Sequence, residues 1–180
     1  MAADKTVKVY GWAVAPVVAR ALLALEEAGV GYELVAMSRD AGDHRRPDHL
    51  ARNRFGKVAV LEDGELMLFE SRAISRYVLR KYKRGGGADL LREGNLEEAA
   101  MVDAWLEAEA HQYHPAISHI VRPCVILPMV GGARHQRVVD EHAGKLREVL
   151  GVLADIAHFG FTHYLMRTEY AALMEERANV

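Results

Sequence analysis

The chain has 180 residues, of which 51% are hydrophobic, and its formal net charge at pH 7 is −2. This length is enough for two small cores but not for two large independent domains, and the nearly balanced charge argues against binding to nucleic acid or to an anionic membrane. The single cysteine, Cys124, excludes an intramolecular disulfide, and the polar residues 1–8 precede neither a signal-peptide core nor a membrane span, so we expect a cytoplasmic protein.

The first 37 residues predict a βαβ unit. Residues 7–10 form a short apolar run that is typical of a buried strand. Pro16 suits the first turn of a helix, and the apolar residues after it recur with helical spacing until Gly29, which is typical of a helix end. Residues 32–37 predict a second strand, which a right-handed crossover would place parallel to the first.

A ββα unit is expected after a polar loop over residues 38–47. Residues 57–61 and 66–69 flank the pair Asp63-Gly64, which is typical of a tight hairpin turn, so these two strands should be antiparallel. Ser71 is expected to cap a helix that runs to about residue 83.

The sequence changes character at residues 84–87, where an arginine is followed by three glycines. We therefore predict one domain over residues 1–84, a linker over residues 85–94 and an all-helical domain over residues 95–180. Helical periodicity covers residues 95–120 and 138–153, and a last helix is expected over residues 161–177.

Polar side chains of the first domain gather where strands end and helices begin, which is where open α/β sheets usually bind ligands. His44, Arg45 and Lys57 offer cations for carboxylates, Ser71 offers a donor at a helix start, and Glu70 suits an ammonium group. A small zwitterion with carboxylates at its ends and one amine matches this set, although other dicarboxylic peptides match it too. The alternative is that Ser71 only caps its helix and that the His44 loop is ordinary surface.

Five strings of the sequence carry a resemblance to a known family. They are VARALLALEEAG (residues 18–29), GDHRRPDHLARN (42–53), FGKV (55–58), VLEDGELMLFESRAI (60–74) and MVDAWLEAEAHQ (101–112). Over residues 7–150, and again over residues 153–174, the sequence resembles the plant phi-class glutathione transferases. The resemblance implies a thioredoxin-like α/β domain of βαβ-ββα order followed by an all-α domain.

The same resemblance implies a glutathione site in the first domain. His44 and Arg45 are expected to approach the glycine carboxylate of glutathione, with Lys57 beside it, and the backbone of Val58 is expected to pair with the cysteinyl unit. Glu70 and Ser71 are expected to hold the γ-glutamyl end.

The implied activity is conjugation of glutathione to hydrophobic electrophiles in detoxification and glutathione metabolism, or reduction of hydroperoxides by the same sulfur. Trp12 and Ile117 are expected to line the hydrophobic substrate site. The resemblance also implies a homodimer that uses glutathione as co-substrate and has no other cofactor. No metal site is expected, because His111 and His114 have helical spacing but no third ligand follows at a motif distance.

The sequence departs from the family pattern in three places. Ala15 occupies the position of the serine that donates to the glutathione sulfur, so no catalytic residue is retained. Ala59 replaces a proline that follows a cis bond, and because a cis bond is more costly without proline, the sequence leaves open whether the bond before Ala59 is cis or trans. A gap between Leu150 and Leu153 removes a helix cap, and with the chain ending at Val180 the helical domain is expected to be incomplete. These departures keep a second function open, a protein that binds glutathione or a hydrophobic ligand without turnover.

Overall fold

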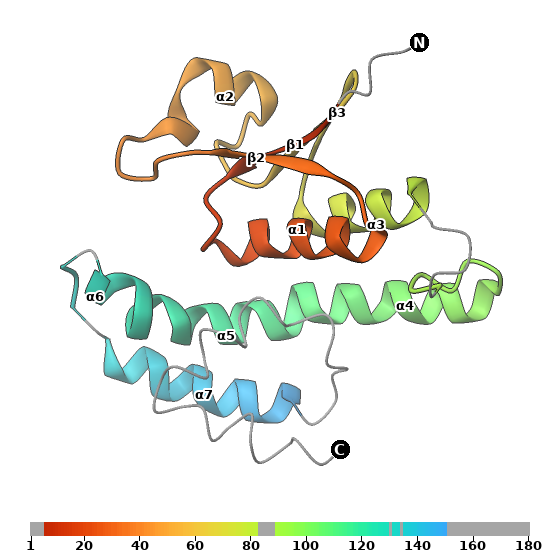
Figure 1. Ribbon diagram of the computed structural model, residues 1–180. Helices are drawn as coiled ribbons and strands as arrows, with labels where there is room; N and C mark the ends of the chain where they lie inside the picture. Colours follow the sequence, from red (N-terminus) through yellow and green to blue (C-terminus); the bar gives the residue numbers. More distant parts are fainter. Residues whose placement is uncertain (1–5, 83–88, 130, 134, 151–180) are drawn as a thin grey trace, which may run out of the picture. The chain divides into compact units, whose positions relative to one another are not determined.

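The computed structural model describes residues 6–82, 89–129, 131–133 and 135–150, and the chain divides into two compact units, Met1–Glu93 and Gly94–Val180 (Figure 1). The helix predicted over residues 161–177 and the altered segment at residues 151–153 lie outside the described residues.

The first unit contains a four-stranded mixed sheet with the order β2-β1-β3-β4. β1 (Val7–Gly11) pairs in parallel with β2 (Tyr32–Ala36), whereas β3 (Val60–Asp63) is antiparallel to both β1 and β4 (Leu66–Phe69). The predicted βαβ-ββα order of a thioredoxin-like domain is confirmed. β3 begins at Val60 rather than at residue 57, because two side chains, and not a neighbouring strand, bind the carbonyl oxygen of Lys57.

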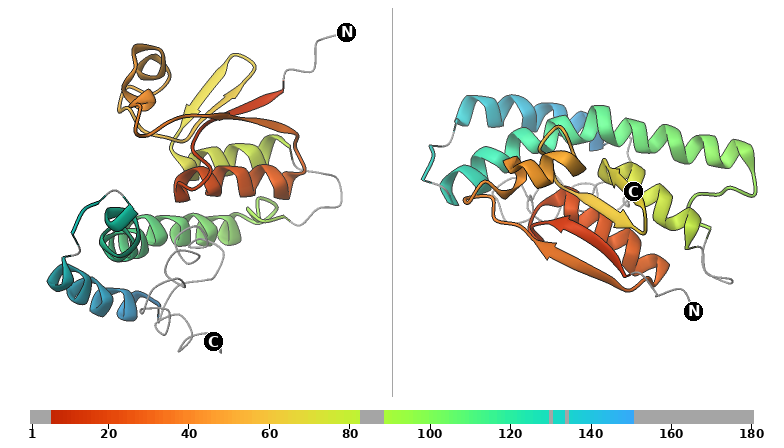
Figure 2. Two further views of the ribbon diagram at one scale, coloured as in Figure 1. Left: turned by 60° about the vertical axis from the view of Figure 1, so that its left-hand side comes forward. Right: turned by 90° about the horizontal axis from the view of Figure 1, so that it is seen from above.

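Two helices, α1 (Pro16–Ala28) and α3 (Ser71–Lys81), lie side by side on one face of the sheet, and α2 (Pro47–Arg52) lies on the other face (Figure 2). α1 begins with a proline in its first turn and ends at Gly29, whose φ of 59° a glycine adopts without strain. The core between this helix pair and the sheet is apolar and includes Val9, Val18, Leu25, Leu61, Ile74 and Val78.

The segment predicted as a polar loop contains two short elements. A 3₁₀ turn, η1 (Asp43–Arg45), precedes α2, which Pro47 opens. Both are too short to show a helical repeat of apolar residues, so the sequence pattern did not reveal them.

The described part of the second unit is helical. Its helices are α4 (Leu96–Ala108), α5 (His114–Val121), α6 (Leu127–Met129) and α7 (Gln136–Leu150), and π-helical stretches at Glu109–Tyr113 and Arg122–Ile126 connect the first three. Asn95 caps α4, since its Oδ1 accepts from the backbone N–H groups of Glu97 and Glu98 at 2.9 and 3.2 Å. α5 packs against α7 around Tyr113, Ile117, Ile120, Val139 and Leu146. None of the helices in the described ranges is long and apolar enough to cross a membrane.

Candidate functional site

The N-terminus of α1 is the first part of the candidate site. Ala15 occupies the N-cap position with extended backbone angles (φ −75°, ψ 126°), and no side chain caps the helix. Its backbone N–H donates to the Trp12 carbonyl at 3.0 Å, and its own carbonyl accepts from Val18 at 2.9 Å. The helix therefore starts with partial positive charge that no side-chain oxygen of Ala15 offsets, an arrangement that favours an anion.

Cationic side chains and Trp12 surround His44 in η1. The rings of Trp12 and His44 meet edge to face with their centroids 5.7 Å apart. Burial lowers the pKa of His44 below its ordinary value of 6.5, and nearby positive groups lower it further, among them Arg45, His49, Arg39 and Lys57. The structure thus brings together His44, Arg45 and Lys57, which the sequence predicted to act together, and the two flexible cations among them are exposed.

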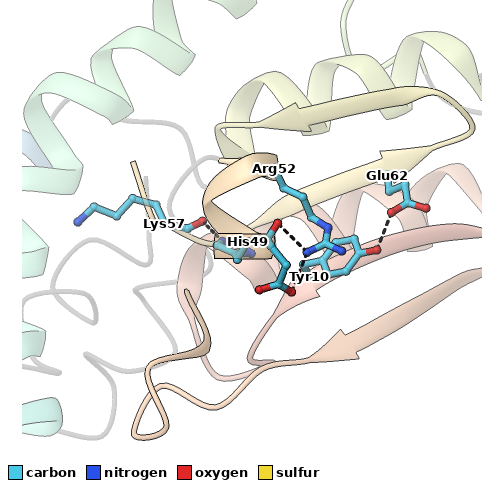
Figure 3. A network of polar contacts seen from close by, with 6 residues as sticks. Tyr10, His49, Arg52, Lys57 and Glu62 are labelled. Atoms are coloured by element: carbon cyan, nitrogen blue, oxygen red, sulfur yellow. Dashed lines mark hydrogen bonds and ion pairs between the residues drawn. The ribbon is translucent and has the colours of Figure 1, made fainter. Parts of the chain in front are cut away.

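A short segment from Lys57 to Ala59 continues the site. The carbonyl oxygen of Lys57 accepts from His49 Nε2 at 2.9 Å and from Asn53 Nδ2 at 3.0 Å (Figure 3 shows the His49 contact). The Val58–Ala59 peptide bond, whose isomer the sequence left open, is cis. Contacts hold this segment on both sides, because the Lys57 carbonyl is bound and Ala59 is buried in the core.

Glu70 and Ser71 form the start of α3. The N-cap residue is Glu70, with φ at 69°, and not Ser71 as predicted. Ser71 is buried within the first turn, and its Oγ accepts from Arg20 Nη1 at 2.9 Å. Glu70 is exposed, and non-glycine residues with positive φ concentrate at functional sites.

The two residues predicted to line a hydrophobic site lie in very different surroundings. Trp12 is partly buried against the core of the first unit, and its neighbour Val14 is 68% exposed. Ile117 is fully buried in the core of the second unit, between α5 and α7, so it offers no surface to a ligand. The expectation for Ile117 came from the family resemblance, and its buried position in this structure does not support it.

Sequence reasoning missed three residues that organise this region, namely Arg20, His49 and Asn53. Each contacts a predicted site residue through a single hydrogen bond, which leaves no periodic signal in the sequence. Tyr10 lies at the other end of the network drawn in Figure 3: its phenol donates to Glu62 and its ring lies under the Arg52 guanidinium at 4.4 Å. Within the described ranges no group of three or more His, Cys, Asp or Glu side chains could hold a metal ion.

Comparison with known proteins places this geometry in a family context. The family model "Glutathione S-transferase, N-terminal domain" matches residues 5–80. The chain is 56% identical to glutathione S-transferase 4 of Zea mays over 195 residues, covering 99% of this chain and 86% of that protein. It is 49% identical to probable glutathione S-transferase GSTF1 of Oryza sativa subsp. japonica, covering 97% of this chain and 87% of that protein.

Solved structures agree with these sequence matches. Glutathione transferase F7 from Populus trichocarpa superposes with a TM-score of 0.89 at 38% identity, covering 96% of this chain and 88% of that chain. Glutathione S-transferase I from maize, in complex with an atrazine glutathione conjugate, gives a TM-score of 0.87 at 43% identity, covering 97% of this chain and 88% of that chain.

Proposed function

The chain belongs to the plant phi class of the glutathione S-transferases, and we propose that it conjugates reduced glutathione to hydrophobic electrophiles in the cytoplasm. The observation that supports this most directly is the cluster of His44, Arg45 and Lys57 beside Trp12. A cationic cluster with an apolar ring at its edge suits a ligand that has a carboxylate at one end and a reactive group near apolar surface.

Glutathione fits the remaining side chains. Its glycine carboxylate would lie near the His44 cluster, and its cysteinyl unit would pair with the backbone of Val58. Its γ-glutamyl end offers an ammonium group to the exposed Glu70 carboxylate and a carboxylate to the Ser71 hydroxyl. Arg20 already donates to that hydroxyl oxygen, which leaves the hydroxyl proton available to the ligand.

The chemical step requires the thiolate of glutathione, which attacks an electrophilic carbon or, in the related reaction, a hydroperoxide oxygen. At Ala15 no hydroxyl can donate to the sulfur, so the partial charge at the start of α1 is the main activating feature. A helix N-terminus stabilises an anion by roughly 0.3–1 kcal/mol, which lowers a thiol pKa by less than about one unit. We therefore expect slow turnover, with glutathione as the co-substrate and no metal or further cofactor.

The absence of the hydroxyl at Ala15 also favours a second candidate function, a glutathione- or hydrophobic-ligand-binding protein without turnover. Conjugation of an aromatic halide, measured beside retention on immobilised glutathione, separates the two functions. Conjugation above the uncatalysed rate supports the transferase, whereas retention without conjugation selects the binding protein.

The site assignment is tested by Glu70→Gln and Ser71→Ala. Glu70→Gln removes the negative charge from the contact with the ammonium group, and Ser71→Ala removes the hydroxyl donor to the carboxylate. Because a charge-assisted hydrogen bond contributes roughly 1.5–3 kcal/mol, each variant should bind glutathione about tenfold more weakly or worse. Glu33→Gln is the matched control, because it removes the same charge from an exposed position on β2. If Glu70→Gln and Ser71→Ala bind glutathione as tightly as the parent and Glu33→Gln, the assignment is wrong.

We also propose that the protein is a homodimer. Phe55 is 67% exposed and its ring meets that of Phe69, which is 36% exposed, edge to face at 6.0 Å. Met67, two residues before Phe69 on the edge strand β4, is also exposed. We call Phe55, Met67 and Phe69 the Phe55 cluster; exposed apolar surface of this kind is typical of a contact between subunits, and a second copy of the chain is the partner that we propose for it.

A further inference from the structure

One carbonyl oxygen in the candidate site receives two hydrogen bonds from buried side chains. His49 and Asn53 are only 1% and 2% exposed, and both donate to the carbonyl oxygen of Lys57. Because a carbonyl oxygen only accepts, the contact requires that His49 Nε2 carries its proton. Within the described part of the chain, His49 Nδ1 has no hydrogen-bond partner, so this oxygen is the only hydrogen-bond partner of the ring.

Asn53 organises the whole turn that leads to Lys57. Its backbone N–H donates to the His49 carbonyl at 2.8 Å, and its own carbonyl accepts from Gly56 at 2.9 Å. Its side-chain Oδ1 accepts from the Phe55 N–H at 3.1 Å, while the Nδ2 group reaches Lys57. The polar atoms of Asn53 therefore close the turn between α2 and the Lys57–Val58 peptide unit.

This turn also packs against η1. A Cβ atom at Gly56, where φ is 58°, would lie 3.0 Å from the His44 carbonyl oxygen and 3.3 Å from Arg45 Cδ. The turn over residues 53–57 and the His44–Arg45 pair are thus in direct contact, so a shift in the turn would move the cationic cluster as well.

We propose that His49 and Asn53 are positioning residues for glutathione: by holding the Lys57 carbonyl from two sides they fix the peptide unit between Lys57 and Val58. Two donors on one carbonyl oxygen occupy both of its lone pairs. The two hydrogen bonds therefore fix the orientation of the peptide plane. That plane sets the direction of the Val58 backbone and the base of the Lys57 side chain. The inference rests on the proposed function, in which Lys57 and the backbone of Val58 contact glutathione.

The principal test compares His49→Leu, His49→Gln and Arg52→Leu by calorimetric titration with glutathione. Leucine removes the donor, whereas glutamine carries an N–H that reaches about as far as His49 Nε2. Arg52→Leu is the matched control, because Arg52 lies on the same helix and contacts Tyr10 and Asp48 but not Lys57. We expect the glutathione Kd of His49→Leu to rise about three- to tenfold, as for one lost hydrogen bond, and those of His49→Gln and Arg52→Leu to stay near the parent value.

A second ligand separates positioning from general loss of stability. Glutathione amide, in which a carboxamide replaces the glycine carboxylate, should bind the parent more weakly than glutathione. In His49→Leu this difference should shrink, because the cations that recognise the carboxylate are no longer held in place. A general destabilisation would weaken both ligands equally and leave their ratio unchanged, which would overturn the inference.

Trypsin cleavage after Lys57 provides a measurement without ligand. The Lys57 carbonyl belongs to the scissile bond, so His49→Leu and Asn53→Ala should be cut there faster than the parent and Arg52→Leu. Cleavage at the parent rate in both variants would overturn the inference, and Asn53→Ala carries the test if His49→Leu does not fold. If the parent itself binds no glutathione, every variant fails alike, and that result overturns the proposed function together with this inference.

Discussion

At the start of α1, one missing oxygen atom affects both stability and chemistry. Ala15 has the extended backbone of an N-cap residue but no side-chain acceptor for the N–H groups of the first turn. A serine at this position could accept from the backbone of Val17 or Val18 in the absence of ligand, and could donate to the glutathione sulfur when ligand is bound. The two uses need the same atom in the same place.

We predict that Ala15→Ser raises both the stability of the protein and its conjugation rate. The cap should increase the free energy of unfolding by about 0.5–2 kcal/mol, and the hydroxyl should raise the rate of aromatic-halide conjugation most near neutral pH, where glutathione is mostly protonated. At high pH, where the thiolate forms without help, the gain should shrink. Ala13→Ser, at an exposed position two residues earlier, is the control for conjugation and for thermal unfolding. A uniform gain at every pH would contradict thiol activation as its cause.

His44 should make glutathione binding depend on pH. Burial, followed by Arg45 and the other nearby positive groups, lowers the pKa of His44 below 6.5, so the free protein holds this ring neutral at pH 7. A bound glycine carboxylate favours the protonated ring, and linkage then requires that affinity rises as pH falls toward the lowered pKa of His44 in the free protein. Calorimetric titration between pH 7.5 and about pH 5 should show this increase in the parent and not in His44→Gln. A parent affinity that is constant over this range would exclude His44 from contact with the carboxylate.

At the scale of elements, a buried carboxylate joins α3 to the β3–β4 hairpin. Asp63, at the end of β3, has Oδ2 within 2.7–2.8 Å of three donors on or just after α3: the Tyr77 hydroxyl, Lys81 Nζ and the Tyr82 hydroxyl. Burial raises the pKa of Asp63, but the hydrogen bonds from Lys81, Tyr82 and Tyr77 outweigh it and bring the pKa below the ordinary value of 3.8. The charged form is therefore the one that the fold stabilises.

We predict that Asp63→Asn destabilises the first unit by about 1.5–3 kcal/mol at pH 7, as expected for hydrogen bonds to a charged group. Because the folded pKa is depressed, this stabilisation is present above pH 3.8 and is lost as pH falls through the folded pKa. The difference between parent and variant should thus be largest at pH 7 and should decrease steadily as pH falls below 3.8. Urea unfolding in a Trp105→Phe background measures this difference in the free energy of unfolding. Trp12 is then the only tryptophan, so its signal reports on the first unit. Asp40→Asn, at an exposed position, should show neither effect.

The sequence predicted the order of elements better than their contacts. The βαβ-ββα order follows from strong local signals, such as Pro16, Gly29 and the Asp63-Gly64 turn, and these signals act within a few residues. α2 and the start of β3 were missed or misplaced because the decisive hydrogen bonds to Lys57 come from side chains that no repeat identifies. Likewise, the contact of Arg20 with Ser71 joins residues 51 positions apart. The polar pattern of the first domain already indicated His44, Arg45, Lys57, Glu70 and Ser71, and the family resemblance assigned each of them a role. The burial of Ile117 shows that a resemblance alone does not establish which side chains remain accessible.

For the whole molecule, the proposed glutathione site and the proposed subunit contact lie in the same one of the two units. Every residue proposed to contact glutathione lies in the unit Met1–Glu93, which has its own sheet and core. The second unit has a separate core around α5 and α7. The Phe55 cluster also belongs to the first unit, and Phe55 lies within the turn that carries Lys57. The proposed subunit contact and the proposed glutathione site therefore share one short segment of the chain.

We predict that Phe55→Ser weakens the proposed homodimer. Burying a phenylalanine side chain contributes about 1.5–3 kcal/mol, and a two-fold symmetric dimer would bury two, so the dimer Kd should rise at least about a hundredfold. Sedimentation velocity over a dilution series measures this change, and Val14→Ser is the control, because Val14 is equally exposed at 68% but lies outside the cluster. Since Phe55 donates its backbone N–H to Asn53 whatever its side chain, the serine variant should keep the turn and bind glutathione near the parent Kd. A monomeric parent, or equal dissociation in Phe55→Ser and Val14→Ser, would contradict the assignment of the Phe55 cluster to the subunit contact.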